Sequence, residues 1–300
     1  MDYILFLLVR ALAGFISLLP VSVSTWMARQ IGDFVFLFAA KRKKTAIDNL
    51  EIAYGDSIPF EQKEKIARES FRNFTTSIIE LVRMPALLRQ AKDRFEFEGT
   101  EHLDAAFQKG KGVILVISHL GSWEYLAFLP FLRGYPCSVI VRPVKNRYLY
   151  KWIQDLRAST QLHPIDRTKS IREVLGEFKK NHLVAILIDQ WAGPDGLWVD
   201  FFSKPTSTTS IPARLSQRTG AALIPAYCLR MDSGRYKICI RPEVPLEGGA
   251  EESEKATTLK LNELLEQEFL KYPAQWIWTH RRWKDFSRYR AAQALINQKG

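Results

Sequence analysis

Residues 113–117 read V-I-L-V-I, and this run limits the possible folds more than any other part of the sequence. Consecutive apolar residues that are mostly β-branched are typical of a strand buried on both of its faces. Such strands occur mainly in parallel sheets that helices cover on both sides. The run therefore predicts an α/β protein.

A polar segment, S-H-L-G-S-W-E, follows this strand at 118–124. His119 lies at the carboxyl end of the predicted strand, which is where open α/β sheets bind their ligands. If a helix begins near Gly121, Glu124 lies in its first turn and can fold back towards the imidazole. A carboxylate bonded to one ring nitrogen fixes the tautomer and makes the other nitrogen a better general base. The alternative is a core histidine with an unrelated glutamate nearby.

Strand and helix signals alternate from residue 95 onward. Further apolar runs lie at 138–141, 183–188 and 221–229, with helical segments at 148–158, 170–179 and 212–219. This alternation indicates βαβ units, and a turn at Asp232 predicts that residues 236–241 form an antiparallel strand. We therefore expect a mostly parallel central sheet flanked by helices, in a single domain over residues 45–300.

Charged residues stand near the carboxyl ends of other predicted strands. Arg142 follows S-V-I-V, Arg167 stands in P-I-D-R-T-K just before a helix, and Asp189 ends L-V-A-I-L-I. Side chains at these positions point into the same crevice as His119, although each of them could also be an ordinary surface charge. Two cations beside His119 and Glu124 suit a substrate that is anionic or that forms an oxyanion.

The first 40 residues are strongly apolar. Arg10 interrupts the run at 3–19, which is at the short end of what a membrane-spanning helix requires. No positive charge precedes this run apart from the terminus, unlike in a secretory signal, and the basic cluster Lys41-Arg42-Lys43-Lys44 follows residue 40. Such a cluster indicates contact with an anionic leaflet on the cytoplasmic side. We expect membrane-associated helices over residues 1–44; the alternative is a pair of buried core helices.

Composition limits the partners and the compartment. The formal net charge of +11 and the pI of about 9.5 favour anionic partners, without choosing among nucleic acid, membrane, phosphorylated substrate and acidic protein. The cysteines, Cys137, Cys228 and Cys239, share no metal-type spacing and are odd in number, so we expect buried thiols in a reducing compartment.

Other catalytic classes find little support in the sequence. It contains no G-x-S-x-G elbow, H-E-x-x-H, P-loop or G-x-G-x-x-G motif. Ser118 and Ser122 are conceivable nucleophiles, but adjacent side chains on a strand point to opposite faces, so Ser118 is poorly placed for activation by His119. His119 is therefore expected to activate a substrate hydroxyl directly.

Several ordered segments resemble the lysophospholipid acyltransferase superfamily, whose signature is His-x4-Asp/Glu, and more narrowly the late (secondary) acyltransferases of bacterial lipid A biosynthesis. The similar segments are A-I-D-N-L-E-I-A-Y-G (46–55), S-H-L-G-S-W-E (118–124), V-R-P-V-K-N (141–146), I-D-R (165–167), D-Q-W-A-G-P-D-G-L-W-V-D-F-F (189–202), R-T-G-A-A-L-I-P-A (218–226) and Q-W-I-W-T-H-R-R-W-K (275–284). Two departures are visible: Ser122 replaces an expected Asn, and F-F-S-K-P-T (201–206) replaces Phe-Phe-Gly-x-Pro-Ala.

The resemblance implies a lysophospholipid-acyltransferase-like fold and a defined chemistry. His119 would be the base and Glu124 its catalytic partner, with Arg142, Arg167 and Asp189 binding the substrate. A hydroxyl of a lipid A precursor would attack an acyl thioester carried by acyl carrier protein or coenzyme A, with no metal and no other cofactor. The carrier is acidic and the glycolipid anionic, so both suit the net charge. The implied location is the cytoplasmic face of the inner membrane.

Two other functions remain open at this point. The same chemistry could act on another lipid, such as a phosphatidylinositol mannoside or a lysophospholipid. A non-catalytic protein that binds a membrane surface or nucleic acid is supported by Arg281-Arg282-Trp283-Lys284, where an aromatic lies among cations. A histidine–glutamate pair deep in a crevice would cost such a protein stability without serving binding, so we expect no nucleic-acid partner.

Overall fold

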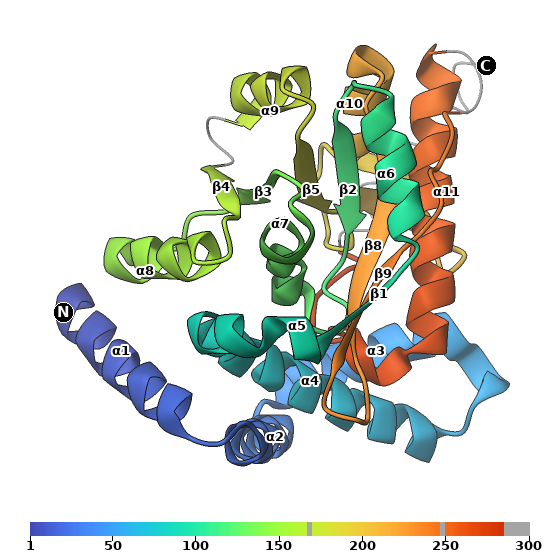
Figure 1. Ribbon diagram of the computed structural model, residues 1–300. Helices are drawn as coiled ribbons and strands as arrows, with labels where there is room; N and C mark the ends of the chain where they lie inside the picture. The colour runs from blue at the N-terminus through green and yellow to red at the C-terminus, as the bar shows by residue number, and fades with distance from the viewer. Residues whose placement is uncertain (167–169, 247–249, 285–300) are drawn as a thin grey trace.

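The computed structural model describes residues 1–166, 170–246 and 250–284. In this part of the chain the central sheet has seven strands in the order β1-β9-β8-β2-β5-β3-β4 (Figure 1). These strands are β1 (Phe95–Glu98), β2 (Val113–Ile117), β3 (Cys137–Val141), β4 (His163–Asp166), β5 (Leu183–Leu187), β8 (Ala222–Arg230) and β9 (Tyr236–Ile240). Strands β8, β2, β5, β3 and β4 run parallel, whereas β9 is antiparallel to β8 and pairs in parallel with β1. The expected mostly parallel sheet is confirmed.

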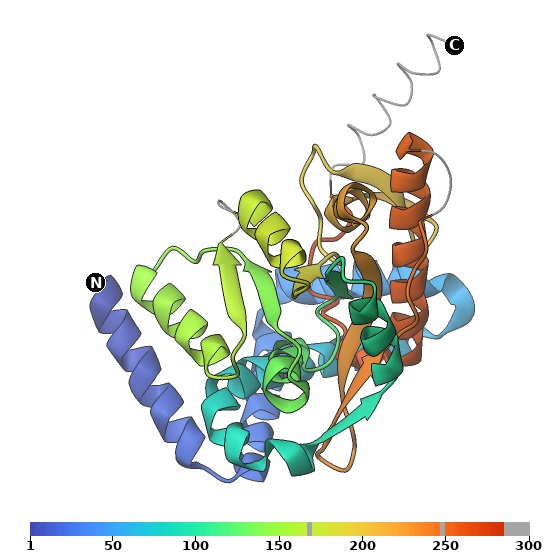
Figure 2. The same cartoon turned by 45° about the horizontal axis from the view of Figure 1, so that its top comes forward.

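Helices cover the sheet on both faces (Figure 2). One face packs against α3 (Ala40–Tyr54), the first half of α4 (Phe60–Leu87), α9 (Ser170–Lys179), α10 (Ile211–Thr219) and α11 (Ala250–Lys271). The other packs against the end of α4, α5 (Ala91–Arg94), α6 (Thr100–Gln108), η3 (Trp123–Ala127) and α7 (Phe128–Arg133). Ile114 and Val116 point to the first face, and Val113, Leu115 and Ile117 point to the second. This double cover explains why every residue of β2 is apolar.

The cysteines lie in the strands of this core. Cys137 begins β3, Cys228 lies in β8 and Cys239 lies in β9; all three are buried and free, as the sequence predicted. Burial raises the pKa of the Cys239 thiol to about 11, so this group stays protonated at physiological pH. Their role is therefore to pack.

A separate hairpin of β6 (Leu197–Phe201) and β7 (Lys204–Thr208) contains one departure from the similar sequences. Its two-residue turn consists of Phe202 and Ser203, with φ of +51° and +54°. Both residues adopt the left-handed conformation that such a turn requires, and glycine adopts it at the lowest cost. Ser203 stands where the similar motif has glycine, so this departure affects the stability of the turn and leaves the catalytic groups unchanged.

The amino terminus forms α1 (Asp2–Leu18) and α2 (Val21–Phe38), in agreement with the two expected helices. Helix α2 crosses α4 so closely that a Cβ on Gly32 would lie 2.6 Å from the Cα of Arg72. Asp33 of α2 pairs with Arg72 at 2.6 Å and with Arg68 at 2.7 Å, and the hydrogen bond from Arg72 is the main reason that its pKa falls to about 2. Helix α2 is therefore part of the folded core.

Helix α1 is attached less closely, and it lies along the edge of the molecule beside α8 (Arg147–Ala158) (Figures 1 and 2). The Asn146 side chain donates to the Asp2 carbonyl at 2.8 Å, and the Tyr3 and Tyr148 rings meet edge to face at 5.1 Å. Among the helices of the described ranges, none is both long enough and apolar enough to cross a membrane.

A carboxyl-terminal segment, residues 275–280, begins at the last residue of η4 (Pro273–Gln275) and is held by polar side chains of α3 and α4. The Asn49 side chain donates to the backbone carbonyls of Trp278 (2.7 Å) and His280 (2.8 Å). The Ser70 hydroxyl donates to the carbonyl of Trp276 (2.6 Å), and the Asn73 side chain donates to that of Gln275 (2.7 Å). All three donors are buried, where an unpaired polar group would be costly. Their hydrogen bonds therefore fix the course of this segment across the end of the sheet.

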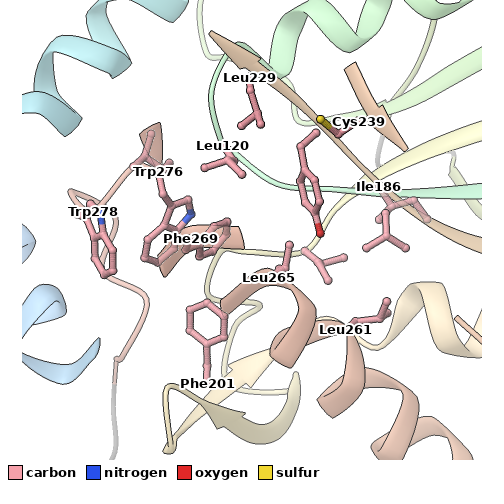
Figure 3. Close-up of a cluster of buried hydrophobic side chains, with 14 of the residues drawn as sticks. Leu120, Ile186, Phe201, Leu229, Cys239, Leu261, Leu265, Phe269, Trp276 and Trp278 are labelled. Carbon is pink, nitrogen blue, oxygen red and sulfur yellow. The ribbon is translucent and has the colours of Figure 1, made fainter. Parts of the chain in front are cut away.

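Trp276 lies inside a cluster of aromatic rings (Figure 3). Its ring stacks on Phe269 at 4.3 Å with an angle of 14° and meets Trp278 edge-on at 4.6 Å. All three side chains are essentially inaccessible to solvent. The indole therefore cannot turn without disturbing the core, and its N–H points in one fixed direction.

Candidate active site

His119 and Asp189 meet at the carboxyl ends of two neighbouring strands. Strands β2 and β5 pair in parallel with Ile117 opposite Leu187, so the residues two positions further along each strand also lie opposite each other. The Nδ1 atom of His119 is 2.9 Å from Oδ1 of Asp189. The register of the sheet therefore creates this pair.

The Asp189 carboxylate accepts hydrogen bonds on both of its oxygens. Its Oδ2 accepts from the backbone N–H of His119 and from Nε1–H of Trp276, each at 2.9 Å, and the side chain has no exposed surface. Burial alone would raise the pKa of Asp189, but the charge and hydrogen bonds of His119, together with Trp276, lower it to about 2. Asp189 is thus ionised at physiological pH, and its contribution to stability is lost only as the pH falls from about 4 to about 2.

Asp189 fixes which ring nitrogen of His119 carries a proton. An ionised carboxylate only accepts hydrogen bonds, so Nδ1 of His119 carries the proton, and Nε2 is the atom that presents a lone pair when the ring is neutral. The His119 side chain is 16% exposed, and Trp123 packs its ring edge-on against the imidazole at 5.2 Å. An oriented imidazole with a free nitrogen and limited access to water is suited to act as a general base.

The expectation that Glu124 folds back onto His119 is wrong. Glu124 lies in η3 and accepts two hydrogen bonds from Arg157 of α8, at 2.7 Å and 2.9 Å. The two side chains are 14% and 17% exposed, so this is a largely buried ion pair. The reason is that Asp189 already occupies Nδ1 of His119, while η3 directs residue 124 towards α8. A catalytic role for Glu124 stays a prediction.

Both oxygens of Asp189 are bonded to groups of the protein, an arrangement that suits the orientation of His119. Substrate binding by Asp189 stays a prediction. Arg142 is exposed in the loop that follows β3, at the same edge of the sheet, and its role in substrate binding stays a prediction. Arg167 lies outside the described residues.

Neither serine of the S-H-L-G-S segment is bonded to His119. The hydroxyl oxygens of Ser118 and Ser122 are buried and have no hydrogen-bond partner among the described residues. The ring nitrogens of His119 contact Asp189 at 2.9 Å and the Gln190 side-chain nitrogen at 3.4 Å. This arrangement favours a hydroxyl supplied by the substrate.

Reasoning from the sequence missed three residues of the site. Trp276 holds Asp189, Gln190 contacts the free nitrogen of His119, and Arg157 neutralises Glu124. Trp276 and Gln190 stand in the segments Q-W-I-W-T-H-R-R-W-K and D-Q-W-A-G-P, so the resemblance contained a signal for both. Arg157 stands in an ordinary helical sequence, D-L-R-A, which gives no such signal.

The chain is similar to several known acyltransferases. The family described as "Bacterial lipid A biosynthesis acyltransferase" matches residues 1–285. The lipid A biosynthesis palmitoleoyltransferase of Escherichia coli is 28% identical over 271 residues, which is 89% of this chain and 86% of that protein. The phosphatidylinositol mannoside acyltransferase of Mycobacterium tuberculosis is 29% identical over 223 residues, which is 71% of this chain and 69% of that protein. A 1-acyl-sn-glycerophosphate acyltransferase structure from Thermotoga maritima aligns with a TM-score of 0.39 and 14% identity. The alignment covers 86% of this chain and 99% of that chain.

Proposed function

The chain belongs to the bacterial lipid A biosynthesis acyltransferase family, and we propose that it transfers a fatty acyl group to a hydroxyl of a lipid A precursor. The donor in this proposal is an acyl thioester, on acyl carrier protein or coenzyme A. The observation that carries the proposal is the His119–Asp189 contact of 2.9 Å, because it leaves Nε2 of the imidazole free to accept a proton. The net charge of +11 suits an anionic glycolipid and an acidic carrier protein.

In the proposed mechanism His119 removes the proton from the acceptor hydroxyl as its oxygen attacks the thioester carbonyl. Asp189 stabilises the imidazolium that forms. Collapse of the tetrahedral intermediate expels the thiolate, which takes the proton back from Nε2. General base catalysis of this kind contributes about 10²–10⁴-fold to the rate.

A phosphatidylinositol mannoside is the second candidate acceptor. The observation in its favour is the relative from Mycobacterium tuberculosis, whose identity of 29% over 71% of this chain compares with 28% over 89% for the lipid A enzyme of Escherichia coli. The proposed chemistry at His119 is the same for both acceptors, because each supplies a hydroxyl group. The acceptor must therefore be identified from the product.

We expect cells that contain the protein to add one acyl chain to lipid A, and cells that carry His119→Ala to lack this addition. The reason is that the substitution removes the proposed base, with a loss of about 10²–10⁴-fold in rate. Mass spectrometry of extracted lipids from deleted and complemented cells measures this directly. Unchanged lipid A together with a changed phosphatidylinositol mannoside would select the second acceptor, and full activity of His119→Ala would refute the mechanism.

We also propose that α1 and α2 lie on the cytoplasmic face of the inner membrane. Both helices expose large apolar side chains: Tyr3, Ile4, Leu5, Leu7, Leu8, Leu12, Phe15, Leu18, Val23, Trp26, Ile31, Phe34, Leu37 and Phe38. Soluble surfaces rarely expose so continuous an apolar area, which suits insertion into the headgroup region. In the basic cluster, Lys43 and Lys44 pair with Glu64 and Asp48, so the apolar side chains are expected to contribute more than these charges.

Combined Leu8→Glu and Phe34→Glu substitutions should weaken binding to phosphatidylglycerol vesicles by at least about tenfold, because each puts a charge where an apolar side chain would enter the bilayer. The measurement is co-sedimentation of the purified full chain. Ile171→Glu on α9 is the control, since Ile171 is also exposed (65%) but lies away from α1 and α2. Point substitutions are preferable to deletion of residues 1–40, which would also remove buried Ala28 and Phe36. Equal binding by wild type and the double variant would refute this orientation.

A further inference from the structure

The side chain of Gln190 contacts Nε2 of His119, the atom that accepts the proton in the proposed mechanism. It follows Asp189 at the end of β5, and its Nε2 atom is 3.4 Å from Nε2 of His119. Because Asp189 keeps the proton of the imidazole on Nδ1, the opposing group must be a donor. The amide NH₂ of Gln190 therefore faces the lone pair of the catalytic nitrogen.

This contact is weak enough for substrate to replace it. A nitrogen–nitrogen distance of 3.4 Å is long for a hydrogen bond, since good N–H donors approach their acceptors to about 3 Å. A substrate hydroxyl that binds to Nε2 of His119 would take the place of the amide. The amide donors of Gln190 would then lie beside the thioester carbonyl that this hydroxyl attacks.

We propose that the side-chain amide of Gln190 donates a hydrogen bond to the oxyanion of the tetrahedral intermediate. The inference rests on the proposed acyl transfer at His119. As the C–O bond forms, the proton of the hydroxyl moves to Nε2 of His119 and the carbonyl electron pair moves onto oxygen, where the amide N–H of Gln190 stabilises it. When the carbonyl re-forms, the C–S bond breaks, and the thiolate takes the proton from the imidazolium.

The surrounding structure holds Gln190 in place before the substrate binds. Its backbone carbonyl accepts a hydrogen bond from Nη1 of Arg282 at 3.2 Å. Arg282 has no exposed surface; its other bonds go to the Ser207 carbonyl and the Thr208 hydroxyl, both at 2.6 Å. Burial lowers the pKa of Arg282 to about 10, while Asp189 opposes this shift, so the guanidinium stays charged. A donor on so fixed a backbone needs little reorganisation during the reaction.

Trp191 is the competing donor, and it provides a matched comparison. Its indole N–H is buried and has no hydrogen-bond partner among the described residues. It follows Gln190 directly, and Lys284 lies over its ring at 4.8 Å. Trp191→Phe removes this N–H and keeps a ring, just as Gln190→Met removes the amide donors and keeps the length of the side chain.

The test is steady-state kinetics of the purified full chain, with dodecanoyl-coenzyme A as donor and an under-acylated lipid A disaccharide as acceptor. Gln190→Met should lower kcat and kcat/KM by the same factor, about 10²–10³-fold, with both KM values and Tm unchanged. Gln62→Met is the control, because Gln62 is an exposed glutamine on α4. His119→Ala is measured in the same assay.

The possible results separate the inference from the function on which it rests. Normal turnover of His119→Ala would refute the proposed function itself. If His119→Ala is inactive, the oxyanion role of Gln190 is overturned by unchanged kcat in Gln190→Met, by a raised KM with kcat kept, or by a lower Tm with normal activity in the folded fraction. A loss of kcat in Trp191→Phe but not in Gln190→Met would assign the oxyanion to the indole instead.

Discussion

Asp189→Asn should lower kcat by about 10⁴-fold while the protein remains folded, which is the effect of the same change in a Ser-His-Asp triad. The reason lies in the donors around residue 189. The backbone N–H of His119 and Nε1–H of Trp276 both point at Oδ2, so the asparagine must turn its carbonyl oxygen towards them. Its NH₂ group then faces Nδ1 of His119, which forces the ring proton onto Nε2 and removes the base.

The measurement is kcat of purified Asp189→Asn alongside its Tm. Asp56→Asn is a suitable control, because Asp56 is exposed in η1 (Gly55–Ser57) and changes charge in the same way. Activity of Asp189→Asn within tenfold of wild type would show that the carboxylate of Asp189 does not set the tautomer of His119. A second expectation concerns acid: wild type should lose stability between about pH 4 and pH 2 relative to Asp189→Asn, because the low pKa of Asp189 stabilises the fold only while it is ionised.

Glu124→Leu should destabilise the protein by about 3 kcal/mol and also abolish activity, because it leaves the largely buried guanidinium of Arg157 without its counter-ion. Burial alone would lower the pKa of Arg157, and Glu124 raises it again, so Glu124 stabilises the charge of the buried guanidinium. A glutamate with a purely catalytic role could be replaced with little loss of folded protein, and we do not expect that result here. Chemical denaturation measures the change in the free energy of unfolding.

The double variant Glu124→Leu with Arg157→Met separates the two possible roles of Glu124. Replacing both charges by apolar side chains of similar size should restore most of the stability, since neither buried charge is then left alone. We expect activity to stay lost, because the double variant restores the packing but not the carboxylate of Glu124, for which a catalytic role is predicted. Recovery of activity together with stability would instead limit Glu124 to a structural role.

Much of the fold could be predicted from local sequence. The run at 113–117 is β2, the helix expected at 170–179 is α9, and the turn before residue 236 produces the antiparallel pair of β8 and β9. These elements depend on the periodicity of apolar residues and on turn residues, which neighbouring positions determine. The shorter strands β1 and β4, and the β6–β7 hairpin, have mixed polarity and little burial pattern, so their residues contain no comparable signal.

The partners of the buried polar residues could not be predicted from local sequence. Asn49 and Ser70 lie in α3 and α4, and their side chains bind the backbone of residues 276–280. More than 200 residues separate these partners in the sequence. Nothing in the local pattern of α3 or α4 identifies a hydrogen-bond acceptor that arrives from the other end of the chain.

By itself, the sequence determined that a histidine follows a doubly covered strand and that the first helices have large apolar surfaces. Only the tertiary structure decided which carboxylate orients that histidine. Glu124 is near His119 in sequence, but the parallel pairing of β2 with β5 places Asp189 opposite it, and Trp276 completes the contact from the far end of the chain. The physical reason is that strand formation depends on local apolar periodicity, whereas the partner of a buried polar atom depends on strand order and register, which are set by packing across the whole chain.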